Sequence, residues 1–214
     1  MIGSNQSEEE TKMRLYKLTD SDGYTCRGKN SDEKGYETLW MEGLIVSASA
    51  EGTELCTNQV IHAYTSPLLA LLLNPIHANI ENPQLWEAEG EVVATDGLKV
   101  GVKSLTTLRK IEVPAISLNQ RVRFAIYCAL EVCADSRFVA WANGWLNCTD
   151  RSEAAARRKA RQWTWGAARL AAWAAADAAW TAEAAAGAAE AAAARAGAKL
   201  DLAAIAEKAI AEEK

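Results

Sequence analysis

The chain has 214 residues, of which 50% are hydrophobic and 24% are charged, and its formal net charge is -5. This composition is ordinary for a globular protein, and the acidic balance argues against a general nucleic-acid binder, which is usually basic. The five cysteines form no C-x-x-C pair and have no zinc-ligand spacing, so we expect reduced thiols in a cytoplasmic protein and no metal site.

The first half of the chain predicts an antiparallel β-rich module. Residues 1–12 are polar and acidic, and we expect them to form a disordered leader. A short apolar segment around Trp40 lies at residues 38–41. Alternating apolar and polar positions predict strands at residues 13–19, 24–26, 43–50, 60–64, 85–93, 98–102 and 107–113.

One short helix interrupts the strands. Ser66 can cap its first turn, and Pro67 suits the first helical position. Residues 68–73 form the body, and Asn74-Pro75 is expected to end it because a residue before proline avoids the helical region. This apolar run is too short to span a bilayer, so we expect no membrane partner.

Two packed helices come after the strands. Residues 119–134 have apolar positions with the three- and four-residue spacing of a buried helix face. A second helix begins at Asp135-Ser136, with Phe138, Ala142, Trp145 and Leu146 facing inward. Residues 147–152 form a polar joint, and either Asp150 or Ser152 can cap a further helix.

From Arg151 onward the sequence is mostly alanine with interspersed tryptophan, and it contains no proline. Alanine has the highest helix propensity, so we predict one long helix from about residue 152 to about residue 195. Gly197 is expected to interrupt it, and residues 200–211 form a short amphipathic end. The fold class is therefore α+β, with a module at 13–149 and an alanine-rich helical tail at 150–214.

One face of the predicted tail helix carries large apolar side chains. Within an arc of roughly 100° lie Trp163, Leu170, Trp173 and Trp180. An isolated alanine helix buries too little surface to hold a fixed place, so it needs a partner. We favour the same helix of another subunit, which would make the chain a homo-oligomer. Packing on its own module and a helix without a fixed partner are the alternatives.

The module has few groups that indicate catalysis. It lacks a phosphate loop, a dinucleotide fingerprint and a nucleophile elbow, so we expect neither a cofactor nor an enzyme. Cys56 with His62 or His77 could form a nucleophile pair, but a small core cysteine is the favoured interpretation. The carboxylates of Glu87, Glu89 and Glu91 share one strand face, which is typical of the solvated side of a sheet.

Six basic residues lie between Lys99 and Arg123, and they are either scattered surface charge or a phosphate site. Arginine forks bind phosphate, and aromatic rings stack on a base. His62 and Tyr64 point to the same side of their strand and could grip a ring or pack in the core. The candidate ligand-binding residues are Trp40, His62, Tyr64, His77, Lys103, Arg109, Arg121 and Arg123.

Four segments in order, YKLTDSDGYTCRG, ELCTNQVIHAYTSPLLALLLNP, LWEAEGEV and DGLKVGVKSLTTLRKI, resemble a phage and prophage domain of unknown function. The resemblance covers residues 13–113, and alanine-rich tails are common in that family. Gln59-Val60 stands where the family has a glycine, so the turn before the histidine strand differs.

With the helices of residues 119–146 added, the chain is also similar to phage anti-Thoeris sponge proteins. That resemblance implies a non-enzymatic protein that sequesters a cyclic ADP-ribose signal or a cyclic oligonucleotide in the cytoplasm of a bacterial host. A more distant resemblance to ADP-ribosyltransferases implies an enzyme using His62, Tyr64 and Glu87 or Glu89. A structural protein assembled through its tail is a third hypothesis.

Overall fold

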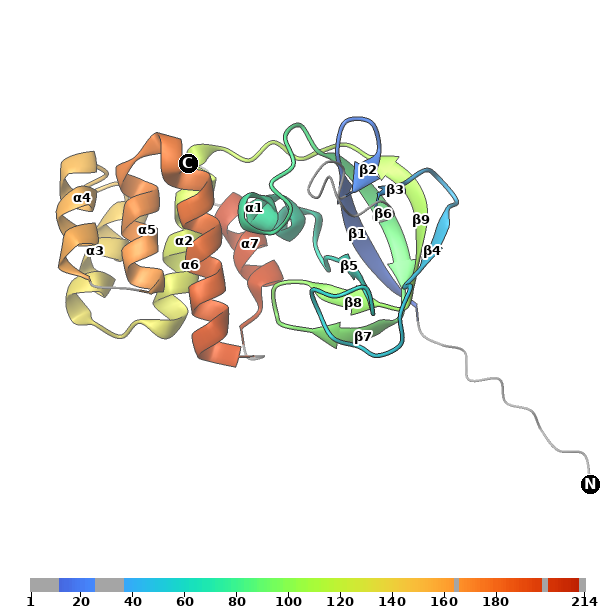
Figure 1. Ribbon diagram of the computed structural model, residues 1–214. Coiled ribbons are helices and arrows are strands. Elements are labelled where there is room, and N and C mark those ends of the chain that lie inside the picture. Colours follow the sequence, from blue (N-terminus) through green and yellow to red (C-terminus); the bar gives the residue numbers. More distant parts are fainter. Residues whose placement is uncertain (1–11, 26–36, 164–165, 198–199, 212–214) are drawn as a thin grey trace, which may run out of the picture.

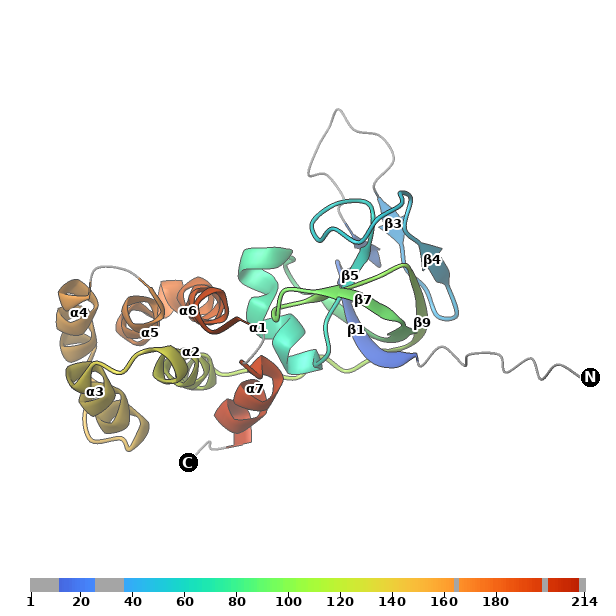
Figure 2. The ribbon, with the colours of Figure 1, turned by 90° about the horizontal axis from the view of Figure 1, so that it is seen from below.

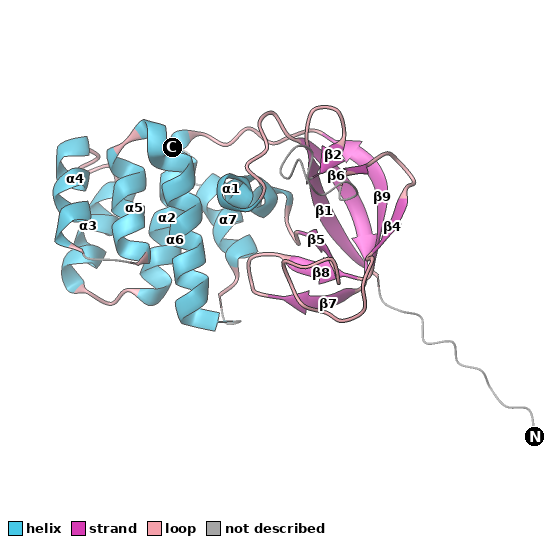
Figure 3. Ribbon diagram, viewed as in Figure 1, coloured by secondary structure: helices cyan, strands magenta, loops and turns pink. Residues whose placement is uncertain are grey.

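The structure is a computed structural model that describes residues 12–25, 37–163, 166–197 and 200–211. The expected disordered leader lies outside these residues except for Lys12, as does Cys26 at the end of an expected strand. Two sheets at one end and a group of helices at the other lie side by side (Figure 1, Figure 3). The expected α+β class is confirmed.

The strands form two main antiparallel sheets. The first has the order β1-β6-β9-β4, and the second has the order β5-β8-β7. A bridge between Tyr16 of β1 and Tyr64, the residue after β5, links the two sheets at this point. The strands are β1 (Met13–Thr19), β4 (Ile45–Ser47), β5 (Ile61–Ala63), β6 (Gln84–Gly90), β7 (Val92–Thr95), β8 (Val100–Val102) and β9 (Ser104–Ile111), and a small pair is formed by β2 (Tyr24–Thr25) and β3 (Thr38–Leu39).

The described chain also contains seven α-helices and the 3-10 turn η1. Helix α1 lies between β5 and β6 in the sequence, and the others come after the last strand. The helices are α1 (Pro67–His77), α2 (Leu118–Val132), α3 (Ser136–Leu146), α4 (Glu153–Gln162), α5 (Ala167–Ala176), the 3-10 turn η1 (Ala178–Trp180), α6 (Thr181–Ala196) and α7 (Leu202–Ala211).

The predicted helix of residues 152–195 is not continuous. Ser152 caps α4 as expected, but the chain leaves the helix at Trp163, where its backbone is extended. Gly166 has a φ of +101°, and Asp177 is extended and accepts the Ala179 N–H, which begins η1. These breaks let α4, α5 and α6 lie side by side (Figure 1, Figure 2), so that weakly apolar alanines become buried between neighbouring helices.

Within the chain, the tail packs on its own module. Helix α6 contacts α2, α5 and α1, and α7 contacts α2 and α1. Small residues on α6 permit close approach; for example, a Cβ on Gly187 would lie only 3.4 Å from the Leu170 side chain of α5. Fully buried alanines on α6 are Ala185, Ala186, Ala188, Ala189 and Ala192.

The four residues of the expected stripe are divided between these packing layers. The ring of Trp163 lies 5.3 Å from that of Phe138 and 6.0 Å from that of Trp141, measured between centroids. Leu170 and Trp173 pack against the same core. Trp180 is different, because 62% of its surface is exposed. Self-association through the tail therefore stays a prediction that concerns chiefly Trp180.

Several element boundaries differ from those expected; for example, the strand expected at 107–113 is β9, Ser104–Ile111, and the strand expected at 43–50 is β4, Ile45–Ser47. The strand predicted at 85–93 ends at Gly90, and the chain then enters the second sheet as β7. Gly90 lies so close to β9 that a Cβ there would be 2.8 Å from the Ser104 carbonyl oxygen. Helix α1 continues through Pro75 to His77. The Asn74 side chain hydrogen-bonds both the N–H and the carbonyl of Ile80, which holds the last turn and the next loop together.

Candidate functional site

A cleft of about 930 Å³ opens between the second sheet, the small β2–β3 pair and the C-terminal end of α1. Its size is at the upper end of the range for small-molecule pockets. The tail contributes one wall residue, Glu190 of α6. The chemically distinctive side chains that line it are Lys17, Trp40, Cys56, His62, Tyr64, His77 and Lys99.

Tyr64 and His77 form a coupled pair in this cleft. The Tyr64 hydroxyl lies 3.2 Å from His77 Nδ1, and the two rings stack with centroids 6.0 Å apart. Burial, helped by the charge of Lys99, lowers the pKa of His77 from 6.5 to about 4. Burial also raises the pKa of Tyr64. Both groups are thus neutral at pH 7, and the pair can present hydrogen-bonding edges without charge.

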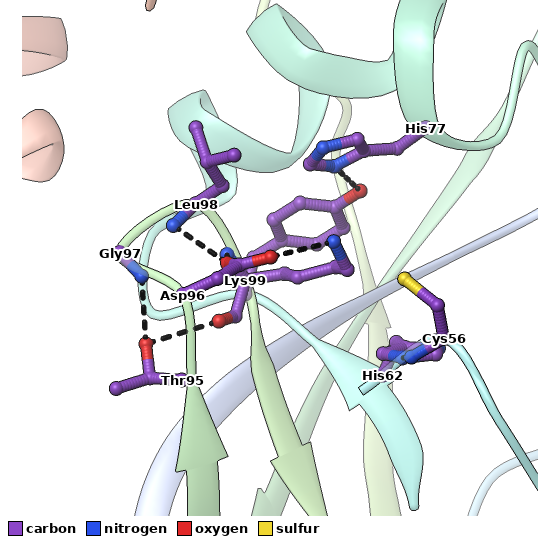
Figure 4. Close-up of polar contacts among 9 residues, drawn as sticks. Cys56, His62, His77, Thr95, Asp96, Gly97, Leu98 and Lys99 are labelled. Atoms are coloured by element: carbon purple, nitrogen blue, oxygen red, sulfur yellow. Dashed lines mark hydrogen bonds and ion pairs between the residues drawn. The ribbon is translucent and has the colours of Figure 1, made fainter. Parts of the chain in front are cut away.

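His62 is engaged by the backbone of the loop before it. The Cys56 N–H donates to His62 Nε2 at 2.9 Å, and Cys56 and His62 lie next to each other in Figure 4. Burial, and after it the charge of Lys17, lowers the pKa of His62. Because the acceptor nitrogen is already occupied, His62 cannot take the Cys56 thiol proton at this nitrogen without losing that hydrogen bond.

Lys17 joins the two sheets at the base of the cleft. Its ammonium donates to the His62 carbonyl at 2.8 Å and lies 5.1 Å from the centroid of the Trp40 ring. Trp40 is only 3% exposed, and its indole N–H donates to Thr25 Oγ1. Trp40 is therefore a supporting wall rather than an open surface for stacking.

The turn between β7 and β8 places a second ammonium in the cleft. Lys99 Nζ lies 2.8 Å from Asp96 Oδ2, and Asp96 Oδ1 accepts the N–H groups of Leu98 and Lys99 (Figure 4). Burial would by itself raise the pKa of Asp96, but the hydrogen bonds from Lys99 and Leu98 outweigh it and hold that pKa below its ordinary value. The ion pair fixes Lys99 beside the Tyr64–His77 pair.

The structure brings together half of the predicted ligand-binding residues. Trp40, His62, Tyr64 and His77 all line the cleft. The four predicted basic residues do not line it, so of the two interpretations left open for them, a phosphate site in this cleft is not supported. Lys99, one of the six basic residues considered for a phosphate site, also lines the cleft, together with Lys17 and Glu190, which the sequence did not indicate.

Each of the four basic residues has a different position. Lys103 Nζ donates to the carbonyls of Ala50 and Gln59, and this holds the loop before β5. Arg109 pairs with Glu87. Arg121 and Arg123 are on α2, where burial lowers the pKa of Arg121 and Arg123 is 5% exposed.

Glu87 does not lie on a solvated sheet face as predicted. It is 5% exposed, and its carboxylate lies 2.9 Å from Arg14 and 2.6 Å from Arg109. The two guanidinium groups cover it from the neighbouring strands β1 and β9. Glu87 and Glu89 are absent from the cleft lining, so the triad implied by the ADP-ribosyltransferase resemblance is not assembled around His62 and Tyr64.

Among the residues that the structure describes, no group of three or more His, Cys, Asp or Glu side chains could hold a metal ion. None of the helices in the described ranges is long and apolar enough to cross a membrane. Comparisons of the chain with protein-family models, with curated proteins and with solved structures found no match. The resemblance to phage domains therefore stays a prediction.

Proposed function

We propose that this chain is a non-enzymatic binding protein that captures a nucleotide-derived small molecule in the cleft. The observation that carries the proposal is the cleft itself, in which two ammonium groups and a neutral Tyr–His pair converge within about 930 Å³. Ammonium groups bind phosphate, and neutral ring edges can hydrogen-bond a nucleobase. His62, the other imidazole, is held by a backbone N–H, which favours binding over proton transfer.

The narrower form of the proposal is an anti-defence sponge of phage origin. Such a protein would bind a cyclic ADP-ribose signal or a cyclic oligonucleotide in the cytoplasm of a bacterial host and would release it unchanged. It would act as a homo-oligomer, for which the exposed Trp180 is the available tail residue. This form rests on the sequence resemblance in addition to the cleft.

The test is capture and release. The protein is incubated with cyclic ADP-ribose isomers and with cyclic dinucleotides, separated from free ligand, heat-denatured, and the supernatant is analysed by mass spectrometry. We expect one of these probes to be recovered intact in stoichiometric amounts. Recovery of a cleaved product would support an enzyme instead, and failure of every probe to bind would refute nucleotide capture.

A matched pair of variants assigns the binding to the cleft. Lys17→Met keeps the aliphatic stem but removes the ammonium, and we expect it to weaken binding about tenfold or more, since a charge-assisted hydrogen bond is lost. Lys110→Met makes the same change at an exposed position of β9, outside the cleft, and should bind as the wild type does. Equal losses in both variants would indicate a non-specific charge effect.

A further inference from the structure

Three side chains from different elements, a hydroxyl, an imidazole and an ammonium group, line the cleft close to one another. Tyr64 is the residue after β5, His77 is the last residue of α1, and Lys99 belongs to the turn between β7 and β8. The Tyr64 hydroxyl lies 3.2 Å from His77 Nδ1. Lys99 is near enough for its charge to lower the pKa of His77 (Figure 4). The fold thus gathers these three polar groups in one part of the cleft.

The ammonium group of Lys99 is held in place but keeps donors for a ligand. The Lys99 side chain is 12% exposed, and its Nζ lies 2.8 Å from Asp96 Oδ2. Asp96 is held in turn, because its other oxygen accepts the backbone N–H groups of Leu98 and Lys99. An ammonium group has three N–H donors, and Asp96 accepts one of them. Lys99 can therefore donate to an anion while its ion pair stays in place.

The hydrogen bond between Tyr64 and His77 can run in either direction, and its direction determines what Tyr64 offers to a ligand. When neutral His77 carries its hydrogen on Nε2, its Nδ1 accepts the Tyr64 O–H. When His77 is protonated, both ring nitrogens carry hydrogen, so Nδ1 donates to the Tyr64 oxygen instead. The hydroxyl hydrogen of Tyr64 is then available to a ligand. Protonation of His77 thus makes Tyr64 a donor for an anion.

A bound anion would in turn favour the protonated form of His77. Burial is the first cause that lowers the pKa of His77 to about 4; the charges of Lys99 and His62 act in the same direction, and that of Asp96 acts against it. A phosphate group beside the imidazole adds an opposite charge, which raises the pKa of a histidine. The other titratable groups of the cleft lining are Lys17, Asp20, Tyr24, Cys56, Glu81 and Glu190.

We infer that Tyr64, His77 and Lys99 form the subsite for one phosphate group of the ligand, and that His77 takes up a proton as this group binds. Lys99 donates from its ammonium group, and Tyr64 donates its hydroxyl hydrogen while it accepts one from His77. The inference rests on the proposed function for its ligand, and it adds the subsite and its dependence on pH. Both ligand classes named there carry phosphate groups, and the subsite holds one of them.

The experiment uses the full chain and dimethyl phosphate, a phosphodiester whose single charge does not change between pH 5 and pH 7. NMR measures its affinity at both pH values and follows the ring signals of the two histidines, which His77→Asn assigns. We expect the probe to raise the titration midpoint of His77 by about one pH unit and to bind about twofold more tightly at pH 5 than at pH 7. Neutral trimethyl phosphate should have neither effect. Sodium chloride at equal ionic strength should raise the midpoint less, because it only screens Lys99.

Matched variants assign these effects to the subsite. Lys99→Met should weaken binding of dimethyl phosphate about tenfold or more, because a charge-assisted hydrogen bond is lost. Tyr64→Phe keeps the ring, and it should weaken binding and reduce the gain in affinity at pH 5. Lys110→Met and Tyr16→Phe make the same two changes outside the cleft lining and should behave as the wild type does.

The outcomes separate the subsite from the proposed function. Equal affinity at the two pH values, tighter binding at pH 7, or no binding of dimethyl phosphate overturns the inference, whether or not the cyclic probes are captured. Equal affinities of the wild type and Lys99→Met overturn it as well. If dimethyl phosphate behaves as expected and no cyclic probe is captured, the subsite stands and the proposed function fails.

Discussion

Glu87 has a buried carboxylate whose charge is balanced by two neighbouring arginines. Its carboxylate is 6% exposed, whereas the side chains of Arg14 and Arg109 are 68% and 65% exposed. Either arginine alone is a weak surface partner, but a buried carboxylate without any cation is costly. We expect Arg14→Ala and Arg109→Ala each to lower the free energy of unfolding by about 1 kcal/mol, and the double variant to lower it by about 3–4 kcal/mol.

Urea denaturation at pH 7 of the four proteins in this double-mutant cycle measures the non-additivity directly. Lys110→Ala, an exposed cation on the same strand, should change stability by less than about 0.5 kcal/mol. Adding Glu87→Gln to the double variant should restore part of the loss, because an amide needs no counter-charge. Strictly additive single effects would mean that the carboxylate is solvated in another way.

The lowered pKa of His77 predicts how the free energy of unfolding depends on pH. Its pKa is lowered from 6.5 to about 4 in the folded chain, foremost by burial. Between these values the unfolded chain binds a proton that the folded chain does not, so stability falls as the pH falls. The contribution of His77 is complete above pH 6.5 and is lost progressively down to about pH 4.

The His77→Asn variant removes this group, so its unfolding free energy should decline less steeply than that of the wild type between pH 6.5 and pH 4. Urea denaturation at several pH values measures the slope. His62 has a lowered pKa as well and leaves part of the slope in place. An NMR titration of His77 with a midpoint near 6.5 would contradict the prediction.

At the scale of the elements, two glycines that look alike in the sequence have opposite roles. A Cβ on Gly90 would lie 2.8 Å from the Ser104 carbonyl oxygen, at the point where the chain passes between sheets. A Cβ on Gly144, in α3, would meet nothing within 4 Å. We expect Gly90→Ala to destabilise the fold by about 1–3 kcal/mol and Gly144→Ala to stabilise it by about 0.5–1 kcal/mol.

Thermal and urea unfolding of both variants provides the comparison, and each variant is the control for the other. A neutral Gly90→Ala would show that β6 and β9 can separate locally without cost. A destabilising Gly144→Ala would place an unrecognised contact on α3.

The elements that could be predicted are those with local signals. Ser66 and Pro67 mark the beginning of α1, and Ser152 marks that of α4. The end of β6 could not be predicted, because the alternation of LWEAEGEVV continues through Gly90 and only its contact with another strand requires glycine. The breaks in the tail could not be predicted either, because every residue near Trp163 except Gly166 is compatible with a helix. Tertiary packing determines where each of these helices ends.

In the candidate site, too, the residues that could be predicted are those with local sequence signals. The alternation along one strand was enough to place His62 and Tyr64 together, and both line the cleft. Lys17 and Glu190 are far from them in the sequence, and only the contact of β1 with β5 and the packing of α6 on α1 bring them in. Of the six basic residues from Lys99 to Arg123, Lys99 lines the cleft and the other five do not, because nearness in sequence does not place side chains on one surface.

At the scale of the whole molecule, the helical tail belongs to the fold of the module. Helices α5, α6 and α7 pack on α1 and α2, and α6 contributes Glu190 to the cleft. We expect a chain truncated after Asp150 to expose the buried faces of α1 and α2, to bind a hydrophobic dye and to lose cooperative unfolding. Circular dichroism and thermal unfolding measure this. A truncated chain that unfolds cooperatively would mean that the module is independent and would favour a purely structural role for the tail.

The last prediction concerns self-association of the chain, and it depends on Trp180. Trp163, Leu170 and Trp173 pack within the chain, whereas Trp180 is 62% exposed on the turn before α6. An exposed tryptophan is a frequent anchor of protein interfaces. We expect the full chain to have an oligomeric mass by light scattering and Trp180→Ala to reduce that mass without lowering the unfolding temperature. Trp163→Ala should do the reverse, because it leaves a cavity beside Phe138 and Trp141 and costs about 2–4 kcal/mol of stability. A wild-type chain that is monomeric at all concentrations would refute assembly through the tail.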